Sequence, residues 1–170
     1  MPNRSYQEFR IITGGQTGVD RGALDAALAA GIPCGGWCPD GRKAEDGVIP
    51  ARYPVQVLPG AGYSQRTRQN VIDSDATLIL YFGELEGGTA QTLTFCRRFG
   101  KPMRVLDLSC LNPNAAAERV RQFLHEQRIR ILNVAGPRAS KVPEAAAVTT
   151  RVLGRVLPKP ARHPGTTDLG

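Results

Sequence analysis

Short apolar runs alternate with longer amphipathic segments along the 170-residue chain. The apolar runs are rich in β-branched residues and end at glycine or polar turns, which is the pattern of strands. The segments between them are mostly about 10–15 residues long and have the composition of helices. The predicted strands are 9–13, 55–57, 76–82, 103–108 and 129–134, and the predicted helices are 17–30, 64–73, 89–99, 114–127 and a last one ending at 157.

This order of elements predicts the fold class. Strands that alternate with helices favour a parallel sheet, because each parallel crossover needs a long connection. The strands are also too continuously apolar for a sheet with one face in water. We therefore expect an α/β fold, a single-domain three-layer sandwich with a mainly parallel sheet, over residues 1–157. Residues 158–170 are rich in proline and lack a pattern, which predicts a flexible tail.

Composition and charge narrow the class of partner. The chain has 41% hydrophobic and 22% charged residues, as ordinary globular proteins do. Its net charge of +7 lies entirely in residues 101–170, which hold twelve basic and five acidic residues, whereas residues 1–100 hold ten of each. Eighteen of the basic residues are arginines, which suit phosphate and carboxylate groups. With only 6% aromatic residues and no basic stripe, a nucleic-acid partner is not expected.

Targeting signals and metal ligands are sparse. Residues 1–9 do not have the pattern of a secretory leader, and no apolar run approaches a membrane span, so we expect a cytoplasmic protein without a membrane partner. Cys34 and Cys38 lack the two-residue gap of a zinc or redox pair, and Cys96 and Cys110 stand alone, so we expect four free buried thiols. The two histidines are far apart, and we predict neither a metal site nor a catalytic set.

Three glycine turns follow predicted strands and precede predicted helices, and the third is expected to place Arg138 beside the start of the last helix. In a parallel sheet, ligands bind beyond the carboxyl ends of the strands, where glycine admits close approach and helix starts offer free N–H groups. The spacing in residues 13–21 fits neither the dinucleotide fingerprint nor a P-loop. A tight turn capped by Thr17 and Asp20 is the alternative interpretation. The candidate ligand-binding residues are Gly14, Gly15, Gln16, Thr17, Gly18, Asp20, Arg21, Gly87, Gly88, Thr89, Asn133, Gly136, Arg138 and Ser140.

Two further segments add candidates. The helix from residue 63 begins with Arg66 and Arg68, which oppose the helix dipole unless an anion compensates them. Asn70 lies one turn after Arg66 on the same face, so Arg66 and Asn70 join the candidate set, with an exposed polar face as the alternative. Residues 34–59, rich in proline and glycine, are long for a loop. They fit either a lid or a subunit contact.

Several motifs of this chain form one recognisable set. They are Ile12–Arg21, Gly35–Pro39, Gly41–Gly47, Gln65–Thr67 with Asn70 and Asp73–Asp75, Gly87–Thr89 and Asn133–Arg138. Together they resemble the molybdenum cofactor carrier family, from about residue 11 to 155. The resemblance implies a Rossmann-like fold related to the LOG (lysine-decarboxylase-like) superfamily. It also implies a homo-oligomer, a dimer or tetramer, that binds and protects the molybdenum cofactor (molybdopterin), a phosphate-bearing pterin.

Function stays open between three classes. A carrier of a small anionic ligand is the first interpretation. A LOG-like phosphoribohydrolase is the second, although the family's catalytic glutamate, three residues after the threonine, is Thr92 here. Glu84 or Glu86 could substitute for it from the loop. A nucleotide sensor is the third. Because the general acid or base is missing from its usual place, we favour the carrier over the enzyme.

Overall fold

A five-stranded parallel sheet forms the centre of the molecule. The computed structural model describes residues 9–159 of the chain. The strands follow the order β2-β1-β9-β7-β8, and every neighbouring pair is parallel. The predicted α/β class with a mainly parallel sheet is confirmed. The strands are β1 (Arg10–Ile12), β2 (Cys34–Gly35), β7 (Ala76–Tyr81), β8 (Met103–Asp107) and β9 (Ile131–Ala135).

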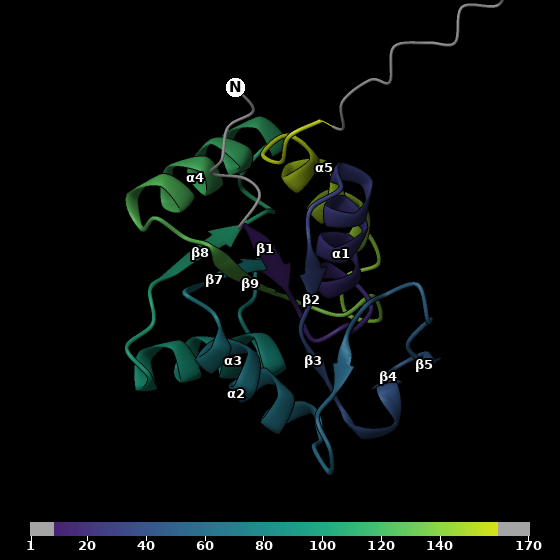
Figure 1. Ribbon diagram of the computed structural model, residues 1–170. Helices are drawn as coiled ribbons and strands as arrows, with labels where there is room; N and C mark the ends of the chain where they lie inside the picture. Colours follow the sequence, from purple (N-terminus) through teal and green to yellow (C-terminus); the bar gives the residue numbers. More distant parts are fainter. Residues whose placement is uncertain (1–8, 160–170) are drawn as a thin grey trace, which may run out of the picture.

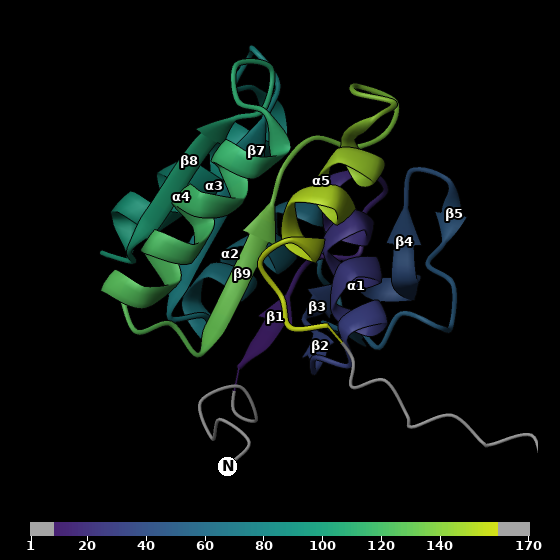
Figure 2. The same ribbon diagram turned by 90° about the horizontal axis from the view of Figure 1, so that it is seen from above.

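Helices cover both faces of this sheet and complete three layers. Helices α1 (Val19–Ala30), α4 (Pro113–Glu126) and α5 (Ala145–Gly154) lie on one face, and α2 (Tyr63–Asp73) and α3 (Gly87–Arg98) lie on the other (Figure 1). Figure 2 shows the first group from above, with α4 and α5 over the sheet and α1 beside them. The residues from Ala76 to Leu80 in β7 are buried throughout, as a strand covered on both faces requires.

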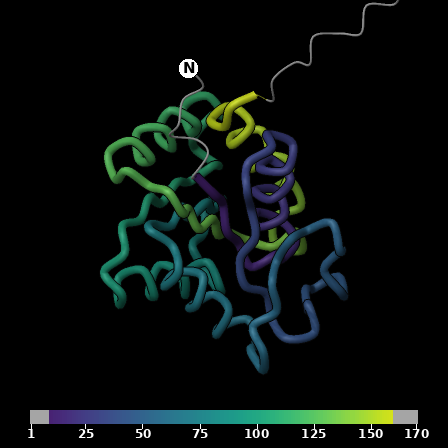
Figure 3. Tube along the Cα trace, viewed as in Figure 1, coloured from purple at the N-terminus to yellow at the C-terminus, as the bar shows by residue number. Residues whose placement is uncertain are grey.

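The segment from residue 31 to 62 adds short strands that the sequence pattern did not predict. It runs along the β2 side of the molecule, in blue in Figure 3. It contributes β2 to the sheet, a parallel pair of β3 (Trp37–Cys38) with β6 (Gln56–Val57), and a hairpin of β4 (Lys43–Ala44) with β5 (Gly47–Val48). Strands of two residues show no periodicity, so only the strand at 55–57 was predicted from the sequence.

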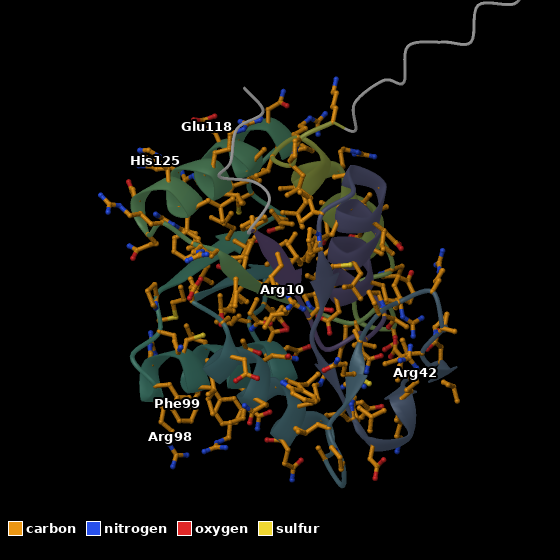
Figure 4. The ribbon with its side chains drawn as sticks, viewed as in Figure 1. Arg10, Arg42, Arg98, Phe99, Glu118 and His125 are labelled. Atoms are coloured by element: carbon orange, nitrogen blue, oxygen red, sulfur yellow. The ribbon has the colours of Figure 1, made fainter. Side chains whose placement is uncertain are left out.

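Arg42 holds this segment together from inside. Its guanidinium donates to backbone carbonyls at distances of 2.9–3.2 Å, and Figure 4 places its side chain beside the hairpin. A planar guanidinium has five donors in fixed directions, so one side chain can fix several positions of a loop. The acceptors are the carbonyls of Ile49, Pro50, Tyr53 and Val55.

The structure corrects several local predictions. Helix α1 begins at Val19 with Gly18 as its N-cap, so neither Thr17 nor Asp20 caps it through a side chain. Helix α5 begins at Ala145, so Arg138 lies in the preceding loop and not at the helix start. The four cysteines are free, and Cys38 and Cys96 are buried as predicted, but Cys34 is only half-buried and Cys110 is exposed. None of the helices within residues 9–159 has the length and hydropathy that a membrane span requires. Residues 160–170 of the predicted tail lie outside the described residues.

Candidate ligand-binding site

A cavity of about 600 Å³ opens where β1, β7 and β9 end. This volume lies within the range of pockets that hold cofactors and nucleotides. Residues from all three predicted glycine turns and from α2 line it, so chain segments more than 100 residues apart meet in one place. The lining includes Gly14, Gln16, Asp20, Tyr63, Ser64, Arg66, Thr67, Asn70, Phe82, Glu84, Glu86, Gly87, Gly88, Thr89, Gln91, Thr92, Asn133, Gly136, Arg138 and Lys141.

Eleven of the sixteen residues in the predicted candidate set line this cavity. Those outside the lining come from the first glycine turn, the start of α1 and the loop before α5. They are Gly15, Thr17, Gly18, Arg21 and Ser140. The cavity therefore uses only part of the first turn, although that turn has the most distinctive sequence of the three.

Four N–H groups of the first turn are taken by the chain itself. Gly15, Gln16, Thr17 and Val19 all donate within 3.0–3.1 Å to oxygen atoms of neighbouring residues. A turn whose donors are already paired has little to offer a bound phosphate. The acceptors are Thr13 Oγ1, Asp20 Oδ2, Gln16 Oε1 and the carbonyl of Pro137.

The second glycine turn, in contrast, has N–H groups that are not paired. Helix α3 begins after Glu86, whose side chain makes no capping bond, and its first turn contains no acidic residue. The first helical bond runs from the N–H of Ala90 to the carbonyl of Glu86. The N–H groups of Gly87, Gly88 and Thr89 have no acceptor among the described residues. Three free donors and the positive end of a helix dipole therefore face the cavity.

A buried ion pair forms another wall of the cavity. Arg66 Nη1 lies 3.2 Å from Asp20 Oδ2, and the two side chains are only 10% and 8% exposed. Arg66 passes over Gly14, where a Cβ atom would lie 1.3 Å from Nη1. Burial raises the pKa of the Asp20 carboxyl above its ordinary value, and the charge of Arg66 opposes that rise. The Nε atom of Arg66 is buried without a hydrogen-bond partner in the described structure.

The hairpin β4–β5 latches onto the first turn through two carboxylates. Asp46 pairs with Arg21, with Nη2 and Oδ1 2.8 Å apart. Glu45 accepts hydrogen bonds from Thr17 Oγ1 and from the N–H and hydroxyl of Ser140. These contacts explain why Thr17, Arg21 and Ser140 lie outside the cavity lining, since each is bound to the hairpin.

The contacts of the latch also lower the pKa values of the two carboxylates that form it. The hydrogen bond from Arg21 holds the pKa of Asp46 below its ordinary value. Burial alone would raise the pKa of Glu45, but hydrogen bonds from Ser140 and Thr17 together bring it below its ordinary value. Arg138 Nε lies 4.0 Å from Glu45, so the hairpin also contacts a residue of the cavity.

Two of the predicted polar residues in the cavity lining form hydrogen bonds to neighbouring strands of the protein. Asn70 accepts from the N–H of Trp37 at 2.8 Å and donates to its carbonyl at 2.9 Å, which ties α2 to β3. Asn133 donates to Thr77 Oγ1 at 3.2 Å. Thr92, at the position of the LOG glutamate, is buried and donates to the carbonyl of Gly88. The second turn of α3 therefore presents no carboxylate to the cavity at this position.

Sequence reasoning missed several lining residues. Lys141 pairs with Glu86 at 3.0 Å across the cavity mouth, and Gln91 donates to Ser64 Oγ at 2.9 Å. Tyr63 adds an aromatic ring, 5.6 Å from the Arg66 guanidinium. The Lys141 pair spans 55 residues of sequence, so no local pattern could indicate it. Within residues 9–159, no group of three metal-ligating side chains could hold a metal ion.

Comparisons with known proteins cover the segments that build this cavity. The circularly permutated YpsA SLOG family, cpYpsA, matches residues 11–157. A similar solved structure is the crystal structure of a "putative molybdenum carrier protein" from Syntrophus aciditrophicus SB. The two proteins are 45% identical with a TM-score of 0.85, over 87% of this chain and 94% of that chain. No curated protein matches the chain.

Proposed function

Because this chain belongs to the circularly permutated YpsA SLOG family, we propose that it is a carrier that binds a small phosphate-bearing ligand in the cavity at the carboxyl edge of its sheet. The ligand that we propose is the molybdenum cofactor. The name of the similar protein from Syntrophus aciditrophicus SB supports a carrier role. The observation that carries the proposal is the open first turn of α3, whose three N–H groups lack an acceptor among the described residues.

The phosphate of this ligand would sit on the N–H groups of Gly87, Gly88 and Thr89. A helix start without a cap or an acidic residue is a ready site for an anion, because free donors and the helix dipole act together. Arg138, which lines the same cavity, would neutralise its charge. The first glycine turn serves as structure in this proposal, since its donors are already paired.

The ring of the ligand would fill the remaining volume. A cavity of about 600 Å³ is larger than a lone phosphate needs and suits a planar ring system with a phosphate attached. Tyr63 and Phe82 offer aromatic surface within the lining. Protection of a reactive cofactor would follow from its burial between α2, α3 and the loop that carries Arg138.

Incubation of the purified protein with molybdenum cofactor tests the carrier role. We expect the native mass to rise by one ligand per chain and the released cofactor to remain intact. Arg138→Ala should weaken retention, because it removes a cation of the cavity, whereas Arg151→Ala on α5 is the matched control. A protein that releases free adenine from AMP, or that retains no cofactor, would overturn the proposal.

Assembly and domain limits are part of the same proposal. We propose a homo-oligomer, a dimer or tetramer, as the resemblance of the motifs implies, and a ligand-binding domain that ends near Leu157. Light scattering on the purified protein measures the number of subunits. Truncation after Leu157 tests the limit of the domain, and we expect the truncated chain to retain the ligand.

A further inference from the structure

Two helices begin side by side at the cavity. Gln91 in α3 donates to the hydroxyl of Ser64 in the first turn of α2 at 2.9 Å. Residues of both first turns line the cavity, including Ser64 and Gly88. The axes of helices in direct contact lie about 8–10 Å apart, so both positive helix ends are within reach of one small ligand.

Helix α2 also begins with N–H groups that lack an acceptor, although the side chain of Gln65 accepts from the N–H of its N-cap Gly62 at 3.0 Å. Its N-cap is Gly62, which has no side chain to accept a bond, and its first turn contains no acidic residue. The N–H groups of residues 63–65 have no acceptor among the described residues. Helix α4 shows the alternative, because the side chain of Asn112 accepts from the N–H of Ala115 at 2.8 Å. Both helices that start at the cavity therefore have free N–H groups, whereas α4 has its own cap.

Arg66 is an independent indication of a second anionic group. Its side chain is nine-tenths buried, lines the cavity, and leaves Nε without a hydrogen-bond partner within residues 9–159. Within the described part of the chain, the one hydrogen bond that this side chain makes goes from Nη1 to Asp20. A guanidinium has five donors, and a buried donor without an acceptor costs about 1–3 kcal/mol. An anion beside α2 would supply acceptors that the chain does not.

We propose that the cavity has a place for a second phosphate beside the first, so that a diphosphate ester of the carried ligand binds more tightly than the monophosphate. One phosphate would sit on the first turn of α3, and the second on the first turn of α2 beside Arg66. This inference rests on the proposed carrier function and deepens it, because it names the chemical class of the ligand. The neighbouring helix starts favour a diphosphate over two phosphates held apart by a ring.

Calorimetric titration with inorganic phosphate and with pyrophosphate, at matched ionic strength, tests this inference. We expect pyrophosphate to bind at least about tenfold more tightly, because it gains a second helix start and Arg66. The same titrations with AMP and ADP show whether a nucleoside attached to the phosphates changes the affinity. A further preference for ADP over pyrophosphate would identify the ligand as the nucleotide form, and equal affinity would assign the diphosphate group alone.

Gly62→Asn is the variant that isolates the second site. Asparagine is a favoured N-cap, and Gly62 has an extended backbone in which a Cβ meets only the end of the Gln65 side chain, at 3.1 Å. The new side chain should take the α2 donors without adding charge or harming the fold. We expect unchanged phosphate affinity and a pyrophosphate preference reduced to less than about threefold.

Arg68→Gln is the matched control on the same helix. Arg68 lies outside the cavity lining and stacks on Phe99, 5.1 Å from the ring centre. Figure 4 shows Phe99 with Arg98 at the outer end of α3.

Equal binding of phosphate and pyrophosphate by the unmodified protein would overturn the second phosphate site and leave the carrier proposal standing. Failure of both anions to bind would overturn the phosphate site on α3 as well.

Discussion

The guanidinium of Arg66 occupies the space where the side chain of residue 14 would begin. A Cβ atom on Gly14 would lie 1.3 Å from Arg66 Nη1 and 2.4 Å from Cζ. The guanidinium cannot move away freely, because it is paired with the buried carboxylate of Asp20. Glycine at position 14 is therefore needed for close approach, not for an unusual backbone angle.

Gly14→Ala should destabilise the protein and open the ion pair. We expect a loss of about 2–4 kcal/mol in the free energy of unfolding, from overpacking and from partial separation of the buried charges. Urea denaturation measures it. Gly154→Ala, where a Cβ would meet nothing within 4 Å, is the matched control and should not destabilise. Equal stability of both variants would contradict this reading of Gly14.

Gly88→Ala should separate binding from folding. Gly88 has an ordinary backbone conformation at the start of α3, and a Cβ there would meet no atom within 4 Å. Alanine is a better helix former, so stability should stay level or rise by about 0.5–1 kcal/mol. Phosphate affinity should fall about tenfold, because the new methyl group crowds the N–H groups that hold the anion. Thermal unfolding and calorimetry measure the two effects, and unchanged phosphate affinity would remove Gly88 from the site.

The long elements could be predicted from the sequence because each has a period or a continuous apolar run. The strand at 76–82 and the helix at 114–127 agree with β7 and α4 to within a residue at each end. The short strands of residues 34–48 could not be predicted, since a two-residue strand has no period and its pairing partner is set by tertiary contacts. Arg42 stabilises this segment through backbone carbonyls, which every sequence offers alike.

The candidate site could be predicted as a location but not as a set of contacts. The glycine turns at residues 14–18 and 87–89 look equivalent in sequence, yet Asp20 and Gln16 fill the donors of the first turn. Arg21 and Arg66 both follow glycine turns or helix starts. Their acidic partners lie 25 and 46 residues away in sequence, and only the fold brings them together.

Asp20 should make anion binding depend on pH. Burial raises the pKa of its carboxyl, and an anion bound beside Arg66 would favour the neutral form further. Binding should then take up a proton, so affinity should rise as pH falls through the pKa of Asp20. Sulfate, which does not itself titrate in this range, is the probe. Affinity that stays constant with pH in the unmodified protein would contradict the prediction.

Asp20→Asn is the variant that assigns this dependence. It should bind sulfate about tenfold more tightly at pH 7, because it removes the negative charge beside Arg66, and its affinity should no longer vary with pH. Removing one partner of a buried ion pair lowers the free energy of unfolding by about 3–5 kcal/mol. The titrations should therefore be run well below the temperature at which the variant unfolds. A variant that retains the original pH profile would place the titrating group elsewhere.

The carboxylates of the β4–β5 latch should release the hairpin in acid. The ordinary pKa values are 4.5 for Glu45 and 3.8 for Asp46, and both are lowered in the folded protein. A lowered pKa contributes stability that is present above the ordinary value and is lost as pH falls through the folded value. The hairpin should therefore stay bound down to about pH 4.5 and detach below that range. Amide hydrogen exchange of residues 40–48, corrected for intrinsic rates and compared with α4, measures the release.

The double variant Glu45→Gln with Asp46→Asn provides the control for this release. It removes both charges while keeping similar shapes, so residues 40–48 should exchange faster than in the unmodified protein even at pH 7, and their protection should change little in acid. Helix α4, whose cap at Asn112 carries no charge, should show the same protection in both proteins. If the hairpin of the double variant is as protected at pH 7 as that of the unmodified protein, Arg42 alone holds the segment and the two carboxylates do not act as a latch.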